Sequence, residues 1–187
     1  MERVLILTGD AGEELEVYYM LYRFREAGYA VDVAAPQRKT LHLVVHDFEP
    51  GLDTYIERPG RRLDADLAFS EVEPERYAAV VIPGGRAPEV IRNDPDVKRI
   101  LAHFFDNDLP VGHMCHGVQV PARTGHIRGR KVSAFPPLAP DIEAAGGEFV
   151  EGADVVDGNM VSATGWPDLA EWSRAFMQVL ERTAVPA

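Results

Sequence analysis

Short runs of apolar and β-branched residues alternate with longer amphipathic runs, and this alternation constrains the fold more than any other feature of the chain. Residues 4–8 predict a buried strand, residues 14–27 an amphipathic helix that ends at Gly28, and residues 29–35 a second strand. Two strands joined through a helix favour a parallel sheet with a right-handed crossover. We therefore expect an α/β fold, a three-layer sandwich with helices on both faces of a mostly parallel sheet.

The alternation is interrupted between residues 37 and 75, where short strand-like pieces are separated by glycine and proline. We predict that this stretch is an insertion of hairpins and loops, and that residues 1–187 form a single domain. After the insertion the patterns predict strands at 78–82, 109–114, 131–134 and 159–163, and helices at 95–106, 117–124, 139–145 and 166–182.

The charge balance argues against two classes of partner. The 187 residues carry a net charge of -11, and the 19 basic residues are scattered, so we expect neither nucleic acid nor an anionic membrane surface as a partner. No apolar run approaches the roughly 18–20 residues that cross a bilayer. The first residues enter a strand directly, without the pattern of a signal peptide, and the lone cysteine suits a reducing compartment. A cytoplasmic location is expected.

That cysteine, Cys115, lies where a predicted strand ends, and Gly117 is among the first residues of the following helix. The arrangement resembles a nucleophile elbow, which presents a reactive side chain on a tight turn. A helix N-terminus would lower the thiol pKa and favour the thiolate. The alternative is a buried structural cysteine, because free cysteine is among the most buried residue types.

Two other strand ends carry residues suited to chemistry. Gly84 and Gly85 would let the backbone approach a ligand and offer N–H groups to an oxyanion, although a Gly-Gly pair is often only a turn. Glu13 and Glu14 are ordinary acidic residues for a helix start, but Glu16 is in a phase that could turn it inward. A carboxyl held beside a thiolate would tend to keep its proton and could donate a hydrogen bond to the sulfur.

Several strings in the chain together resemble the DJ-1/PfpI superfamily. They are residues 9–17, 46–48, 54–55, 57–60, 82–89 (IPGGRAPE), 115–117 (CHG) and 156–159 (VDGN). The resemblance extends from about residue 3 to residue 180 and is strongest to the PfpI-like branch, which includes plant DJ-1 homologues with glyoxalase III activity. It implies a flavodoxin-like, class I glutamine amidotransferase-like arrangement of the sheet.

The resemblance also implies roles for individual residues. The implied catalytic residues are Cys115 as nucleophile, Glu16 as the carboxyl that tunes the sulfur, His116 as the neighbouring histidine, and Glu89, which would reach the histidine of an adjacent subunit. The implied oxyanion donors are backbone groups of Gly84, Gly85 and His116. A homo-oligomer, dimer or higher, is therefore expected, with no cofactor.

Three positions depart from the superfamily pattern. Phe135 stands where tyrosine is usual, His113 and Met114 replace smaller residues before the cysteine, and Leu169 falls where a histidine is often found. We expect Glu13, His46, His113 and Phe135 to line the pocket. With one cysteine and no histidine pair at helical spacing, no metal site is expected.

Three functions remain open from the sequence. The first is a cysteine-dependent enzyme that acts on small reactive carbonyls without a cofactor, in the manner of glyoxalase III or a deglycase, converting methylglyoxal to lactate. The second is a PfpI-type intracellular cysteine peptidase that uses the same residues on a peptide substrate. The third is an oxidative-stress sensor or chaperone-like protein whose cysteine is oxidised to a sulfinate.

Overall fold

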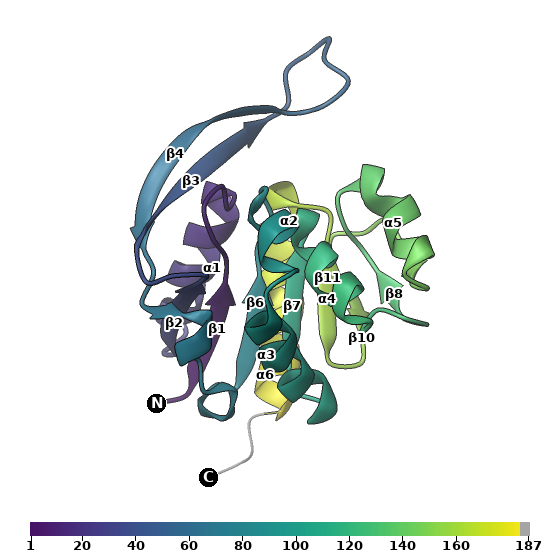
Figure 1. Cartoon of the computed structure of the whole chain (residues 1–187). Coiled ribbons are helices and arrows are strands. Elements are labelled where there is room, and N and C mark those ends of the chain that lie inside the picture. The colour runs from purple at the N-terminus through teal and green to yellow at the C-terminus, as the bar shows by residue number, and fades with distance from the viewer. Residues whose placement is uncertain (184–187) are drawn as a thin grey trace.

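The computed structural model describes residues 1–183, in which a seven-stranded sheet lies between two layers of helices (Figure 1). The strands are β1 (Arg3–Leu7), β2 (Ala30–Ala35), β3 (Thr40–Asp47), β4 (Ile56–Asp64), β5 (Leu67–Ala68), β6 (Ala79–Ile82), β7 (Val111–Met114), β8 (Lys131–Val132), β9 (Glu148–Phe149), β10 (Val155–Asp157) and β11 (Met160–Ala163). The α-helices are α1 (Glu14–Glu26), α2 (Ala87–Ile91), α3 (Pro95–Asp106), α4 (Gln119–Thr124), α5 (Ala139–Ala144) and α6 (Leu169–Thr183). Short 3-10 helices are η1 (Phe69–Glu71), η2 (Pro74–Arg76), η3 (Cys115–Val118), η4 (Pro136–Leu138) and η5 (Trp166–Asp168).

The strand order of the main sheet is β10-β11-β7-β6-β1-β2-β5. All neighbouring strands are parallel except β10, which runs antiparallel to β11. The chain passes from β1 to β2 on one side and later returns to β6 on the other side, which places a topological switch point at β1 and β6. Ligands bind at the carboxyl ends of such strands in open α/β sheets. The predicted three-layer α/β fold is confirmed, and it is flavodoxin-like.

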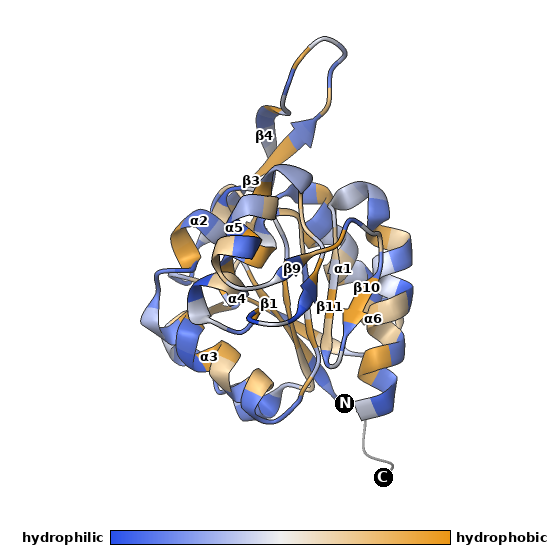
Figure 2. Cartoon of the chain, turned by 90° about the vertical axis from the view of Figure 1, so that its right-hand side faces the viewer, coloured by the Kyte–Doolittle hydropathy of each residue, from blue (hydrophilic) through white to orange (hydrophobic). Residues whose placement is uncertain are grey.

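The core explains why β1 and β6 are apolar along nearly their whole length. Val4 and Ile6 of β1 pack on one face of the sheet with α1 and α6, whereas Leu5 and Leu7 pack on the other face with α3. Because both faces are covered, each residue of such a strand is buried, as parallel sheets require. Figure 2 shows the result, with hydrophobic strands inside and helices that are hydrophobic on one side only.

Strands β3 and β4 form a separate antiparallel pair that extends past the carboxyl ends of the main strands (Figure 1). We call this pair and its connecting loop, residues 40–64, the arm. Leu41 and Leu43 of β3 are buried in the same core cluster as α1, whereas β4 is mostly exposed. The arm is therefore attached to the body through one face of β3, and its loop is carried over the end of the sheet.

The short elements differ most from the sequence-based expectations. The strand expected at 131–134 is reduced to β8, which pairs with β9 outside the main sheet. The ladder ends because the Ser133 N–H donates to the hydroxyl of Ser162 instead. Helix α2 and the antiparallel edge strand β10 were not predicted, since five- and three-residue elements are too short to show a period.

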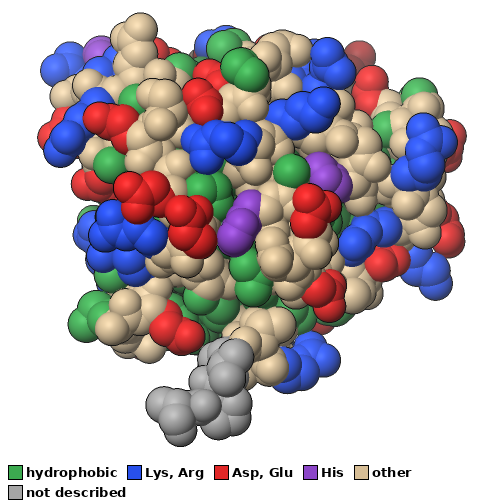
Figure 3. Space-filling view, turned by 60° about the horizontal axis from the view of Figure 1, so that its bottom comes forward, with side chains coloured by type: hydrophobic (Ala, Val, Ile, Leu, Met, Phe, Trp, Pro, Cys, Tyr) green, Lys and Arg blue, Asp and Glu red, His purple; other side chains and the backbone are tan. Residues whose placement is uncertain are grey.

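The surface in Figure 3 carries acidic and basic side chains interspersed, with hydrophobic side chains only in small separate spots. This face lies at the end of the body opposite the arm. Among the helices of residues 1–183, none is long and apolar enough to cross a membrane.

Candidate active site

Cys115 occupies a strained turn between β7 and η3. Its φ is 52°, in the left-handed region that residues with a side chain rarely adopt. Such strain persists only where the surroundings hold the backbone, and it is common at functional sites. The elbow expected from the sequence is therefore present, at the carboxyl edge of the strand next to the switch point.

Two buried carboxyls lie at the start of α1. Glu13 is the N-cap, and its Oε2 accepts the backbone N–H of Glu16 at 2.9 Å, while Oε1 has no partner in the protein. Burial raises the pKa of Glu13 to about 7. Burial, followed by the charge on Glu13, raises the pKa of Glu16 to about 8. Glu16 therefore keeps its proton at neutral pH, as expected for a carboxyl beside a thiol.

Gly84 makes the contact between this carboxyl and the thiol possible. Its N–H donates to Glu16 Oε2, and a Cβ at this position would lie 2.9 Å from that oxygen and 2.6 Å from the Cβ of Cys115. Gly85 has a φ of 77°, and a Cβ there would lie 2.3 Å from the carbonyl oxygen of Ala11. Neither position can carry a side chain without displacing the backbone or the thiol.

The thiol pKa differs from the sequence-based expectation. Burial raises the pKa of Cys115, and a charged Glu16 raises it further, whereas the backbone N–H groups of His116 and Gly85 lower it. The expected net decrease is wrong, because the sulfur is removed from water as it enters the turn. Backbone donors do face the sulfur, but the resting side chain is a thiol that needs a base.

His116 is the candidate for that base. Its Nδ1 lies 3.3 Å from the sulfur of Cys115, and the ring stacks on Phe135 with 5.4 Å between centroids. Burial lowers the pKa of His116 to about 4. The imidazole is therefore neutral near pH 7, and the tautomer protonated on Nε2 can accept the thiol proton.

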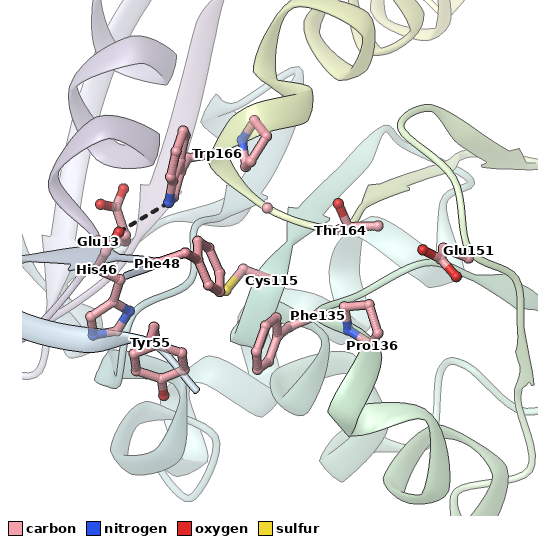
Figure 4. A pocket seen from close by; sticks show the side chains of 12 residues that line it. Glu13, His46, Phe48, Tyr55, Cys115, Phe135, Pro136, Glu151, Thr164 and Trp166 are labelled. Carbon is pink, nitrogen blue, oxygen red and sulfur yellow. Dashed lines mark hydrogen bonds between the residues drawn. The ribbon is translucent and has the colours of Figure 1, made fainter. Parts of the chain in front are cut away.

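Cys115 opens into a cavity of about 270 Å³ at the base of the arm (Figure 4). Its wall is mainly aromatic and proline side chains. The lining residues are Glu13, His46, Phe48, Tyr55, Cys115, Phe135, Pro136, Glu151, Thr164, Gly165, Trp166 and Pro167. They come from the N-cap of α1, the arm, the start of η3, the segment around η4, the loop before β10 and the segment that follows β11.

The arm is held over the cavity by a polar network. His46 of β3 stacks on Tyr55 with 4.2 Å between centroids, and its Nε2 lies 2.9 Å from Glu57. Arg86, at the start of α2, donates twice to Glu57, at 2.7 and 2.8 Å. Hydrogen bonds from Arg86 lower the pKa of Glu57 to about 2. The indole N–H of Trp166 donates to the carbonyl oxygen of His46 at 3.2 Å, from the opposite wall.

One residue expected to line the pocket, His113, lies elsewhere. His113 does not line the cavity: it is fully buried on β7 and packs beneath Gly117, and neither ring nitrogen has a partner in the protein. The expectation is wrong because β7 continues past His113 for one residue before the chain turns outward. Glu89, which was expected to act on an adjacent subunit, is exposed on α2 and lies outside the cavity wall of its own chain; its role across an interface stays a prediction.

Comparison with known proteins identifies the family of the chain. The model of the DJ-1/PfpI family matches residues 2–179. The chain belongs to the DJ-1/PfpI family. It is 36% identical to Deglycase TK1284 of Thermococcus kodakarensis, over 95% of this chain and 99% of that protein. It is also 34% identical to Protein DJ-1 homolog D of Arabidopsis thaliana, over 96% of this chain and 48% of that protein.

A solved structure shows the same fold. It is a two-domain protein from Anabaena variabilis with DJ-1/ThiJ/PfpI-like and ferritin-like domains, which is 26% identical with a TM-score of 0.84. The match covers all of this chain and half of that one. The resemblance to the DJ-1/PfpI family that the motifs indicated is therefore confirmed.

The departures from the DJ-1/PfpI pattern have distinct places in the structure. Phe135 lies in the cavity wall, so the ring is retained without a hydroxyl. Leu169 begins α6 and is buried in the core beside that helix. Within residues 1–183, no group of three or more His, Cys, Asp or Glu residues is placed to hold a metal ion.

Sequence reasoning missed part of the cavity wall. Pro136 and Trp166 begin the three-residue helices η4 and η5, and Glu151 lies in a loop, so none of them belongs to an element long enough to show a period. The one available signal was the aromatic residue at 166, which follows closely on the end of a predicted strand, where ligand-binding residues collect in α/β sheets.

Proposed function

We propose that this protein is a cysteine-dependent enzyme that converts small α-oxoaldehydes, such as methylglyoxal, to 2-hydroxy acids without a cofactor. The observation that carries the proposal is the thiol of Cys115 beside the neutral imidazole of His116, inside a cavity of about 270 Å³. That volume suits a small molecule better than an extended peptide chain. Relatives named as deglycases support an activity of this kind.

The first step is addition of the thiol to the aldehyde. His116 accepts the proton as the sulfur attacks, a carbon–sulfur bond forms, and the carbonyl π electrons move to oxygen. Backbone N–H groups of Gly85 and His116, which face the sulfur, are placed to stabilise the developing negative charge. Return of the proton to this oxygen gives a hemithioacetal.

The second step moves hydrogen between the two carbonyl carbons. The hemithioacetal carbon loses its proton to a nearby base, and the neighbouring carbon gains one. The first carbon is thereby oxidised to a thioester while the ketone is reduced to an alcohol. We assign this transfer to Glu13, which lines the cavity, has one unpartnered oxygen and has a pKa of about 7. Water then cleaves the thioester and releases the 2-hydroxy acid and the free thiol.

Glu16 and Glu89 have supporting roles in the proposal. Glu16, whose pKa of about 8 keeps it protonated at neutral pH, would donate a hydrogen bond to the sulfur and limit the charge at the buried site. Glu89 is exposed on α2 and is free to approach the His116 of an adjacent subunit. The active unit would then be a homo-oligomer.

The test is to incubate the purified protein with methylglyoxal and to measure both its consumption and the formation of lactate. We expect stoichiometric lactate from the wild type and none from Cys115→Ser. Consumption without lactate, or equal activity in the variant, would refute the proposal. Turnover of a fluorogenic peptide, with a thioester trapped on Cys115, would instead support the peptidase.

A further inference from the structure

Four aromatic rings surround the entrance to Cys115, and they come from separate segments of the chain (Figure 4). Phe48 and Tyr55 belong to the arm, Phe135 precedes η4, and Trp166 begins η5. The centroid of Phe48 lies 6.2 Å from that of Phe135 and 6.3 Å from that of Trp166, and Tyr55 lies 5.6 Å from Phe135. These spacings are those of rings in mutual contact, so they form a nearly continuous aromatic wall.

The cavity wall contains acidic side chains. Glu13 and Glu151 contribute carboxyls to the cavity wall. Among the described residues that line the cavity, none is a lysine or an arginine. Arg86 is near, but both of its bonds to Glu57 hold it to the arm. A substrate that carries a carboxylate or phosphate would therefore lose water without gaining a counter-charge.

We propose that this cavity selects α-oxoaldehydes whose second substituent is an uncharged aryl group. The inference rests on the proposed function and adds the class of substrate. The aldehyde carbon would meet Cys115 while the aryl ring packs against Phe48, Phe135 and Trp166. Phenylglyoxal and water would give mandelate, by the same internal hydrogen shift that gives lactate from methylglyoxal.

Phe135 adds to the selection against substrates with a polar substituent. A phenylalanine leaves this part of the wall without a polar group to bind a hydroxyl or carboxylate of the substrate. Phe48 is 55% exposed on the arm, so its ring is available to a substrate and is not needed to fill the core. Phe48 touches the other rings of the wall, and its exposed face is what we expect the substituent of the substrate to contact.

The experiment compares initial rates for methylglyoxal, phenylglyoxal and 4-carboxyphenylglyoxal, with formation of each 2-hydroxy acid as the readout. We expect kcat/KM for phenylglyoxal to exceed that for methylglyoxal by roughly tenfold, since each aromatic pair contributes a factor of about 2 to 10. The kcat/KM for 4-carboxyphenylglyoxal, which carries an added carboxylate, should be equal to or lower than that for methylglyoxal.

Phe48→Ala should lower the ratio of phenylglyoxal to methylglyoxal kcat/KM by roughly 2- to 10-fold. Leu52→Ala is the matched control, because Leu52 is exposed on the same loop but does not line the cavity. Equal ratios in the two variants, or no preference for phenylglyoxal in the wild type, would overturn the inference while methylglyoxal turnover still supports the proposed function. If no oxoaldehyde is converted to its hydroxy acid, both are refuted.

Discussion

Replacing His113 by leucine should stabilise the protein, and by more at acid pH than at neutral pH. The side chain is fully buried on β7, and neither ring nitrogen has a partner in the protein. Burial lowers the pKa of His113 from 6.5 to about 3. Below pH 6.5 the unfolded chain therefore binds a proton that the folded protein does not, so this histidine removes stability as the pH falls.

The size of the effect follows from the shift. Each pH unit between 6.5 and 3 costs about 1.4 kcal/mol, so lowering the pH to 5 removes about 2 kcal/mol of folding free energy through His113. At pH 7.5 the gain from leucine comes only from removing an unpartnered polar ring, worth about 1–3 kcal/mol, less a repacking cost of up to about 1.5 kcal/mol. His113→Leu should thus be neutral or modestly stabilising at pH 7.5. At pH 5 the free energy of unfolding gained through the substitution should be larger by about 2 kcal/mol.

Urea unfolding followed by tryptophan fluorescence at the two pH values measures this difference. His42→Gln is the control, because that histidine is exposed on β3 and its exchange leaves the core unchanged. A stability difference for His113→Leu that is the same at pH 5 and pH 7.5 would contradict the argument. A clear loss of stability at pH 7.5 would show that the ring has a partner after all.

Two further predictions concern the active site. Gly84→Ala should abolish most turnover and most alkylation of Cys115, because the added Cβ would lie 2.6 Å from the Cβ of Cys115. Overpacking of this kind costs about 1–3 kcal/mol of folding free energy. A folded variant with full activity would refute the close approach. Glu16→Gln should lower the pH midpoint for alkylation of Cys115 by iodoacetamide, because the second cause that raises the thiol pKa, the charge on Glu16, is removed while burial remains. A midpoint that is unchanged or higher would contradict this coupling.

Some features of the site could be predicted from the sequence, because residues close to one another in the chain determine them. The strand that ends at Met114, followed by Cys115 and Gly117, predicted a tight turn with a cysteine on it, and the structure has that turn. The period of 3.6 residues in the helix that begins at Glu14 predicted that Glu16 points inward, and Glu16 is buried in the structure. These features depend on neighbours close in sequence, so the pattern carried enough information.

The thiol pKa could not be read in this way. A helix N-terminus beside Cys115 predicted a lowered pKa, but the direction depends on how far the sulfur is removed from water. That quantity is set by Gly84, Glu16 and the cavity wall, which come from distant parts of the chain. His113 was misplaced for a similar reason, because the number of residues between it and the turn decides whether it points into the cavity or the core.

The sequence by itself determined the order of the longer strands and helices, the elbow at Cys115 and the inward carboxyl, since each follows from local periodicity and turn chemistry. Only the tertiary structure decided what surrounds the thiol. Phe48 of the arm and Trp166 after β11 are 118 positions apart, yet their rings lie 6.3 Å from each other over the cavity. Such long-range packing depends on how the arm passes the carboxyl ends of the main strands, and no periodic pattern encodes that contact.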